Sequence, residues 1–305
     1  MSRWTAQDIP DQTGRTVLVT GANSGLGLRS AEALAAKGAR VLMGCRNADK
    51  AAVALDLVAE AATGPAPEVV PLDLADLESV RKAAADVGGR TERLDVLMNN
   101  AGVMATPYQQ TPDGFELQLG TNHLGHFALT GLLLPLLRAA EAPRVVNTSS
   151  QAHRMGRMRW DDLQWTRRYD RWQAYGQSKL ANLLFTFELT RRAGAALTVA
   201  AGHPGWAATH LQAAGPEMSG RKATARLMDL ANAVFAQSDA MGALPQLYAA
   251  TMPDVRSGDY FGPDGLFERA GHPKRVGTTK AARDQAMATR LWEESERLTG
   301  VAIDL

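Results

Sequence analysis

Tyr175 and Lys179 are the residues of this sequence whose types and spacing best suit chemistry. They lie four positions apart in a stretch where Leu180, Leu183 and Leu184 recur at helical intervals. A helix places residues four apart on one face, with roughly 5–6 Å between their Cβ atoms. Because an ammonium group beside a phenol favours the phenolate, we expect the pKa of Tyr175 to fall below its usual ~10. Such a tyrosine can act as an acid and a base near neutral pH, although the pair also suits an ordinary amphipathic surface helix.

A glycine-rich turn predicts a nucleotide-binding site. Residues 16–20 form a short β-branched run, and residues 28–37 are rich in alanine and leucine, which is typical of a strand followed by a helix. Between them the spacing is G-x-x-x-G-x-G, at Gly21, Gly25 and Gly27. Glycines let the backbone approach a pyrophosphate, and the N-terminus of the helix supplies N–H donors. A tight turn that binds no ligand is the alternative.

The position that selects the cofactor carries a basic residue. NAD sites have a carboxylate about 20 residues beyond the glycines, whereas an arginine there accommodates the 2′-phosphate of NADP. The predicted second strand, 40–44, is followed by Cys45, Arg46 and Asn47, with no acid. A guanidinium group can pair bidentately with a phosphate. The sequence therefore favours NADP(H) over NAD(H), with a solvated Arg46 as the alternative.

Polar residues also follow the predicted strands 68–72 and 94–98. Asp73, with Leu74 after it, suits either the adenine amino group of a cofactor or the cap of the helix 77–87. The second of these strands ends in the run Asn99-Asn100-Ala101-Gly102. Two asparagine side chains can tie neighbouring strand ends together, and Ala-Gly leaves room for a ribose. A plain polar turn is the alternative.

Two later strands and one helix complete this pattern. Strand 144–148 ends in Ser149-Ser150, and strand 197–201 ends in the run Gly202-His203-Pro204-Gly205-Trp206, with Thr209 just beyond. Asn122 lies inside a predicted helix, where asparagine is a poor helix former, so we expect a role for its side chain. His123 and His126 share this helix. No third ligand follows at metal-binding spacing, so we expect packing or supporting roles for them and no metal.

Alternating strands and helices predict an α/β fold, a single doubly wound (Rossmann) domain over residues 1–305 with a seven-stranded, mostly parallel sheet. In such folds ligands bind at the carboxyl ends of the strands, where the polar residues above fall. The amphipathic segment 207–241 is a candidate substrate lid, with a core helix as the alternative. We expect the tail, 279–305, to be helical and largely solvated.

The composition excludes several classes of protein. Lys and Arg number 33 against 32 Asp and Glu, and a net charge of +1 gives no reason to expect a nucleic-acid partner. The single cysteine, Cys45, allows no internal disulfide and favours the cytoplasm. The first residues lack the apolar core of a signal peptide. The most apolar run, 127–137, is too short to span a bilayer, so we expect no membrane span.

Together these motifs resemble the short-chain dehydrogenases/reductases over roughly residues 15–265. In the family's order, the matches are Thr20-Gly21-x-x-x-Gly25-x-Gly27, Asp73-Leu74, Asn99-Asn100-Ala101-Gly102, Asn122, Ser150, Tyr175-x-x-x-Lys179 and Pro204-Gly205. Further runs look like the retinol-dehydrogenase-like branch: Cys45-Arg46-Asn47, Asn122-His123-Leu124-Gly125-His126-Phe127, Ser149-Ser150-Gln151-Ala152-His153 and Tyr175-Gly176-Gln177-Ser178-Lys179. That branch prefers NADP and acts on lipophilic alcohols and carbonyls, including retinoids and steroids.

The resemblance implies a role for each matched residue. Tyr175 would be the general acid/base, and Lys179 would lower its pKa and hold the nicotinamide ribose. Ser150 would hold the substrate oxygen, and Asn122 would anchor a proton-relay water. The cofactor contacts would be Gly21, Asn23, Ser24, Gly25, Leu26, Gly27, Arg46, Asp73, Leu74, Asn100, Ala101, Gly102, Tyr175, Lys179, Pro204, Gly205, Trp206 and Thr209. The expected activity is NADP(H)-dependent interconversion of a lipophilic alcohol and its aldehyde or ketone.

Other functions stay open, because a fold does not fix a function: a non-catalytic NADP(H)-sensing protein, or a reductase of an activated C=C bond. The sequence also departs from the shorter members of the family in one place. The segment 151–173, between Ser150 and Tyr175, is about twice as long as in many of them. It is a candidate rim of the substrate pocket, or a cover over a surface used elsewhere for subunit contacts. A monomer and a homo-oligomer therefore both stay possible.

Overall fold

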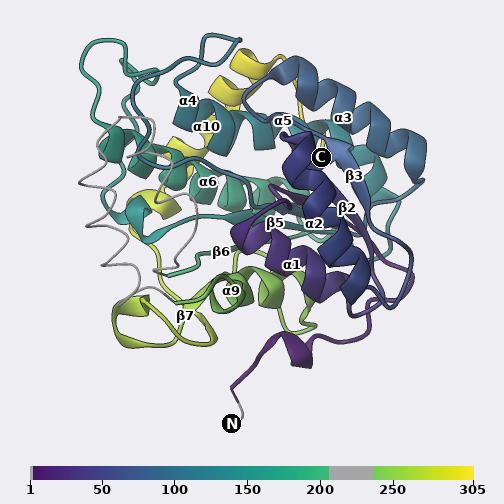
Figure 1. Cartoon of the computed structure of the whole chain (residues 1–305). Coiled ribbons are helices and arrows are strands. Elements are labelled where there is room, and N and C mark those ends of the chain that lie inside the picture. Colours follow the sequence, from purple (N-terminus) through teal and green to yellow (C-terminus); the bar gives the residue numbers. More distant parts are fainter. Residues whose placement is uncertain (1–2, 206–236) are drawn as a thin grey trace, which may run out of the picture.

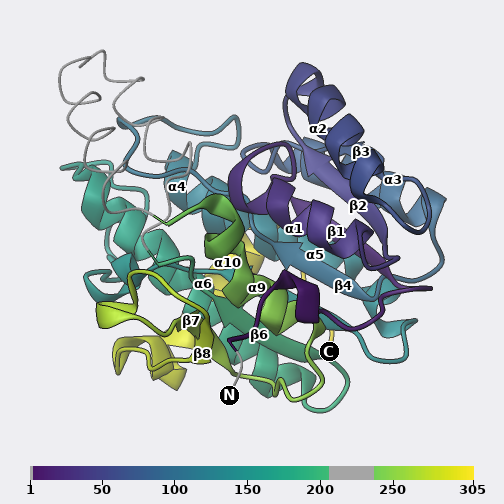
Figure 2. The same ribbon diagram turned by 60° about the horizontal axis from the view of Figure 1, so that its bottom comes forward.

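Eight strands form one sheet in the computed structural model, which describes residues 3–205 and 237–305. The strands are β1 (Thr16–Thr20), β2 (Arg40–Cys45), β3 (Glu68–Pro71), β4 (Val96–Asn99), β5 (Arg144–Thr148), β6 (Thr198–Gly202), β7 (Tyr260–Pro263) and β8 (Pro273–Arg275). Their spatial order is β3-β2-β1-β4-β5-β6-β7-β8, with β3 and β8 at opposite edges (Figure 2). All neighbours are parallel except the antiparallel pair β7 and β8. The predicted doubly wound sheet is confirmed, with one short strand more than the seven expected.

Helices cover both faces of this sheet (Figure 1). One face is packed by α1 (Gly25–Ala35), α2 (Ala48–Ala61) and α9 (Asp239–Thr251). The other is packed by α3 (Leu77–Arg90), α5 (Gly125–Arg138) and α6 (Arg171–Ala193). The short helix α4 (Leu117–Leu119) and a π-helical turn, Gly120–Leu124, lead directly into α5. Each face of the sheet therefore carries its own apolar core, which holds the carboxyl ends of the strands in a fixed array.

The expectation of a largely solvated tail is wrong for α10 (Gln285–Thr299). Its apolar side chains recur at helical intervals: Trp292, 1% exposed, packs in the core shared with α3 and α5, and Leu291, 3% exposed, packs in a further cluster against Leu184 of α6. The residues that follow the helix, Val301 and Ile303, are buried in the same core as Trp292. Of its charged residues, Glu296 accepts from the Nε1 of the buried Trp292 at 2.9 Å, while others such as Arg297 are exposed. The number of charged residues led to the prediction of a solvated helix, but the spacing of the apolar residues decides how the helix packs.

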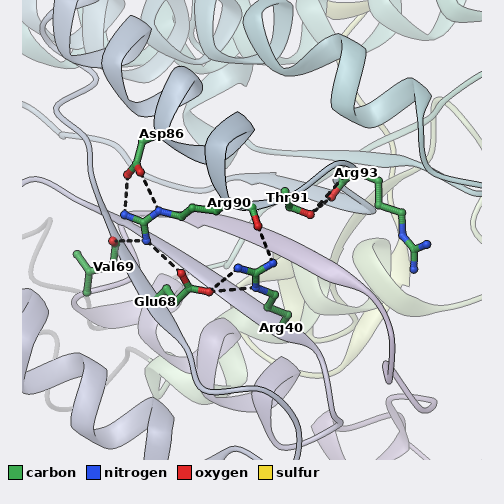
Figure 3. Close-up of polar contacts among 7 residues, drawn as sticks. All are labelled: Arg40, Glu68, Val69, Asp86, Arg90, Thr91 and Arg93. Carbon is green, nitrogen blue, oxygen red and sulfur yellow. Dashed lines mark hydrogen bonds and ion pairs between the residues drawn. The ribbon is translucent and has the colours of Figure 1, made fainter.

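At the amino ends of β2 and β3, opposite to the carboxyl ends of the strands, charged side chains form a network (Figure 3). Glu68, the first residue of β3, accepts from Arg40, the first residue of β2, at 2.7 Å. Arg90, at the end of α3, lies 3.3 Å from Glu68 and 2.7 Å from Asp86. These contacts hold the amino ends of β2 and β3 to α3. The carboxyl ends stay open for ligands.

The predicted lid, 207–241, lies outside the described residues except for its last few, 237–241. Among the helices that the structure describes, none has the length and apolar character needed to cross a bilayer.

Candidate functional site

A cavity of about 760 Å³ lies at the carboxyl ends of the strands, where the order of the sheet reverses between β1 and β4. Seventeen of the residues predicted for the site line it: Gly21, Asn23, Ser24, Gly25, Leu26, Gly27, Arg46, Asp73, Leu74, Asn100, Ala101, Gly102, Ser150, Tyr175, Lys179, Pro204 and Gly205. Asn122 is not among the lining residues and is fully buried. Trp206 and Thr209 lie outside the described residues.

The glycine turn is folded tightly against the start of α1. Gly21 has a φ of 67° and Gly25 a φ of 52°, in the left-handed region that favours glycine. A Cβ at Gly27 would lie 2.2 Å from the main-chain oxygen of Gly21, so only glycine allows this closure. The helix begins at Gly25, three residues earlier than expected, because the turn itself supplies its first residues. The N–H groups of the first turn of α1 therefore border the cavity.

The two asparagines at the end of β4, Asn99 and Asn100, tie strand ends together, as predicted. The Nδ2 group of Asn99 donates to Oδ1 of Asn147 at 2.9 Å, and that of Asn100 donates to the main-chain oxygen of Thr20 at 2.8 Å. Sequence reasoning missed the role of Thr20. Its hydroxyl oxygen accepts from the main-chain N–H groups of Asn100 and Ala101, both at 2.9 Å. The glycine turn and the loop after β4 are thus locked to each other at the floor of the cavity.

Asn122 fixes the wall next to this floor. Its Oδ1 accepts from the main-chain N–H of Val103 at 2.7 Å, and its Nδ2 donates to the main-chain oxygen of Val103 at 2.9 Å. The same Nδ2 donates to the hydroxyl of Ser178 at 2.9 Å. Asn122 sits in the π-helical turn before α5, a type of irregularity that is common at functional sites. The side-chain role expected for this asparagine is therefore a tie between α6 and the Gly102–Val103 loop.

Ser150, Tyr175 and Lys179 converge in the cavity from β5 and α6. The Lys179 Nζ lies 5.7 Å from the centroid of the Tyr175 ring and donates to the main-chain oxygen of Thr148 at 3.2 Å. The expectation of a lowered tyrosine pKa is wrong here. Burial raises the pKa of Tyr175 to about 12, although the neighbouring Ser150 side chain opposes this. Burial also lowers the pKa of Lys179 to about 8.

The surroundings of Lys179 fit a nicotinamide dinucleotide. Its ammonium group has three N–H donors, and Thr148 supplies the hydrogen-bond acceptor found for it among the described residues. A Cβ at Gly102 would lie 3.4 Å from Nζ and 3.0 Å from Oδ1 of Asn122, so this glycine keeps the space beside the ammonium free. Buried donors that face open space suit the hydroxyl groups of a ribose.

The end of the cavity near β2 and β3 carries Arg46 and Asp73. The Arg46 guanidinium is 66% exposed and lies 3.9 Å from Asp73 Oδ2, which is beyond hydrogen-bond distance. The alternative role of Asp73 as a helix cap is wrong, because Asp76 caps α3 by accepting from the N–H groups of Glu78 and Ser79. The side chain of Asn47 caps the N-terminus of α2 by accepting from the N–H of Lys50. Neither Arg46 nor Asp73 caps a helix, and both side chains border the cavity.

The segment 151–173, the candidate rim of the substrate pocket, contributes apolar side chains to the wall of the cavity. Met155 and Trp172 line the cavity although they are 42% and 37% exposed, as does Met104 from the loop after β4. Asp170 caps α6 by accepting from the N–H of Trp172. Trp172 then lies three residues before Tyr175 on one helix face, with their ring centroids 6.5 Å apart. That spacing was the signal available in the sequence.

His123 and His126 are buried beside the site, as packing residues. His123 is 1% exposed, and its Nε2 lies 2.8 Å from the hydroxyl of Ser295, while its ring packs on Phe185. The Nδ1 of His126 lies 3.0 Å from the main-chain oxygen of Asn122. Within residues 3–205 and 237–305, no three His, Cys, Asp or Glu side chains gather as metal ligands would.

The doubly wound sheet and the cavity at its carboxyl ends are the architecture of a nucleotide-binding enzyme, and the chain belongs to the short-chain dehydrogenase family. The family model described as short chain dehydrogenase matches residues 15–219. The relatives of this chain include retinol dehydrogenases, in agreement with the resemblance to the retinol-dehydrogenase-like branch. Retinol dehydrogenase 13 of Homo sapiens is 42% identical over 292 residues, which cover 94% of this chain and 85% of that protein.

Two solved structures extend the comparison. A crystal structure of an uncharacterised protein from Mycobacterium paratuberculosis shares 44% identity over 100% of both chains, with a TM-score of 0.82. The RhlG/NADP active-site complex of Pseudomonas aeruginosa shares 26% identity over 85% of this chain and 98% of that chain, with a TM-score of 0.65.

Proposed function

We propose that this protein is an NADP(H)-dependent oxidoreductase that interconverts a lipophilic alcohol and its aldehyde or ketone. The observation that carries the proposal is the convergence of Ser150, Tyr175 and Lys179 on one cavity at the carboxyl ends of the strands. The substrate class is supported by the relatives, which are named for a lipophilic alcohol, retinol. The apolar side chains of Met104, Met155 and Trp172 along the cavity support it as well.

Each of the three polar side chains has a chemical task in this proposal. When bound, the nicotinamide cofactor supplies the hydride in reduction and takes it up in oxidation. The hydroxyls of Ser150 and Tyr175, which both line the cavity, would hold the substrate oxygen between two O–H donors. With a pKa of about 12, Tyr175 keeps its proton at neutral pH and can donate it to an oxygen that gains charge. Lys179, whose pKa is about 8, stays largely charged at neutral pH and stabilises the phenolate left behind.

The preference for NADP(H) is supported by the basic residues at the far end of the cavity. Arg46 and Lys50 both line it, and the guanidinium of Arg46 is free to pair with a phosphate dianion. The solved relative from Pseudomonas aeruginosa is a complex with NADP. A carboxylate that would bind the ribose 2′-hydroxyl of NAD is missing directly after β2, where Arg46 and Asn47 follow Cys45.

An NADPH-oxidation screen over aldehydes, ketones and enones of graded lipophilicity tests the proposal. We expect turnover of lipophilic aldehydes or ketones, and a loss of roughly 10²–10⁴-fold in Tyr175→Phe with NADPH binding intact. Tyr108→Phe, at an exposed tyrosine outside the cavity lining, is the matched control and should keep full activity. Substantial activity in Tyr175→Phe would refute the proposed role. Tight NADPH binding without turnover of any compound would favour a sensing protein, and turnover of enones alone a C=C reductase.

A further inference from the structure

The hairpin loop between β7 and β8, residues 264–272, lies beyond the part of the chain matched by the family model and contributes Arg269 to the lining of the cavity. It belongs to the edge of the sheet at which β8 pairs with β7 (Figure 2). Phe267 and Glu268 within it have φ values of 52° and 56°, in the left-handed region that non-glycine residues rarely adopt. Such strained backbone persists only where surrounding contacts hold it, and it clusters at functional sites.

One set of contacts ties this loop to the segment that follows Ser150. The Nε2 group of Gln151 donates to the main-chain oxygens of Phe267 and Glu268, at 2.6 and 3.0 Å. The guanidinium of Arg154 lies 3.5 Å from Oε1 of Glu268. Both strained residues are thus held by the turn that carries the proposed substrate-binding serine.

A second set of contacts ties the loop to the turn after β6. Gly205 has a φ of 66°, and a Cβ there would lie 2.4 Å from the main-chain oxygen of Arg269, so the two backbones are in direct contact. Gln237 bridges the same two segments. Its Nε2 donates to the main-chain oxygen of Pro204 at 2.5 Å, and its Oε1 accepts from the N–H of Gly271 at 3.1 Å.

His203 is the link between Glu268 and the Pro204–Gly205 turn. The main-chain N–H of Gly205 donates to its Nδ1 at 3.2 Å, so that nitrogen carries no proton. The remaining ring proton is on Nε2, which lies 3.1 Å from Oε2 of Glu268. The His203 side chain is 0% exposed, whereas that of Glu268 is 19% exposed. The carboxylate therefore fixes both the tautomer and the orientation of the ring that holds Gly205.

We propose that Glu268 is a positioning residue for cofactor binding. Through His203 it fixes the Pro204–Gly205 turn, and through Gln151 and Arg154 its loop is locked to the serine segment. Two walls of the cavity are then formed before a nicotinamide dinucleotide enters. This inference rests on the proposed function, because Pro204 and Gly205 are the predicted cofactor contacts at this end of the cavity. The short strand β8 closes the hairpin that delivers Glu268.

Binding of NADPH, measured by titrating its fluorescence with the whole protein, tests the proposal without requiring turnover. Glu268→Ala should raise the NADPH Kd about tenfold, because the ring of His203 loses its acceptor. Glu268→Gln should stay within about twofold of the unchanged protein, because an amide oxygen can accept the same N–H. Glu78→Ala, which removes an exposed carboxylate paired with Lys82 at 3.2 Å, is the matched control and should have no effect.

His203→Asn provides a second route to the same link. Its amide oxygen can still accept from Gly205, but it cannot reach Glu268, so we expect a similar loss of affinity. Combining it with Glu268→Ala should cost little more than either change alone, because both remove one interaction. Three results would overturn this inference and leave the proposed function standing: normal NADPH binding by Glu268→Ala, equal losses of affinity in Glu268→Ala and Glu268→Gln, or additive losses in the double variant. A wild-type protein that binds neither NADPH nor NADH would overturn the proposed function together with it.

Discussion

Arg46 shows how a single side chain can set the choice between two cofactors that differ by one phosphate. Its guanidinium is 66% exposed and approaches Asp73 only to 3.9 Å, so its strongest donors are not committed within the described chain. An exposed arginine with one distant carboxylate partner contributes little to the stability of the fold. The same guanidinium group is well suited to bind a phosphate dianion.

We predict that Arg46→Ala weakens NADPH binding about tenfold and leaves NADH binding nearly unchanged, because only NADPH carries the 2′-phosphate. Isothermal titration with each cofactor measures both affinities. Arg297→Ala is the matched control: its side chain is also 66% exposed, and it pairs with Glu294 on α10, outside the cavity lining. Equal losses of NADPH and NADH affinity in Arg46→Ala would refute the phosphate contact.

The same scale shows what residue types and spacing can predict. The four-residue interval between Tyr175 and Lys179 predicted that both would share one helix face, and the polar residues at the predicted strand ends were needed to place that face at a ligand site. The direction of the tyrosine pKa was not predictable from that interval, because burial decides it. Tyr175 is 7% exposed and Lys179 4%. Because both side chains have lost most of their hydration, burial is the largest cause of the pKa shift of each group.

Among the elements, α6 and the segment 151–173 act as one unit. The segment crosses the helix one residue after Tyr175, the proposed acid/base, where Gly156 meets the main-chain oxygen of Gly176. The side chain of Gln177 in α6 also binds the segment at two places. It accepts from the N–H of Arg159 at 3.1 Å and donates to the main-chain oxygen of Leu163 at 2.9 Å. The position of Tyr175 therefore depends on a contact between two backbones.

We predict that Gly156→Ala destabilises the protein by about 1–3 kcal/mol, because its Cβ would lie 2.2 Å from the main-chain oxygen of Gly176 and backbone cannot move aside cheaply. Turnover should fall as well, since α6 carries Tyr175. Gly88→Ala is the control. Gly88 lies within α3 with no atom within 4 Å of its Cβ position, so alanine should stabilise the helix by roughly 0.5–1 kcal/mol. Urea denaturation gives both values, and equal shifts of the same sign would contradict the close crossing.

The sequence predicted the bounds of some strands well and missed one strand entirely. β1 and β5 begin and end at the predicted residues, because buried parallel strands are short apolar runs bounded by polar turns. β8 was missed, since Pro273–Arg275 contains no β-branched or aromatic residue and pairs only at an edge. Its importance comes from the hairpin it closes, which brings Glu268 to His203 across 65 positions of sequence. No local pattern carries such a contact.

For the molecule as a whole, three buried histidines couple folding to pH. His123, His126 and His153 are 1–2% exposed. Burial lowers the pKa of His123 from 6.5 to about 3 and those of His126 and His153 to about 4. All three are neutral in the folded protein at pH 5, whereas the unfolded chain binds protons there. The stability that they contribute is thus complete above pH 6.5 and is lost as the pH falls toward 4. Glu116, whose pKa burial raises, acts in the opposite direction.

We predict that the free energy of unfolding falls steeply between about pH 6.5 and pH 4.5, by up to about 4 kcal/mol per pH unit if all three histidines titrate together on unfolding. Urea denaturation at a series of pH values measures this slope. His123→Gln, which keeps a partner for Ser295, should reduce the slope by about 1.4 kcal/mol per unit, because one fewer proton is taken up. A free energy of unfolding that is the same at about pH 7 and about pH 5 would contradict burial of neutral histidines, because the unfolded chain must then bind protons that the folded protein excludes.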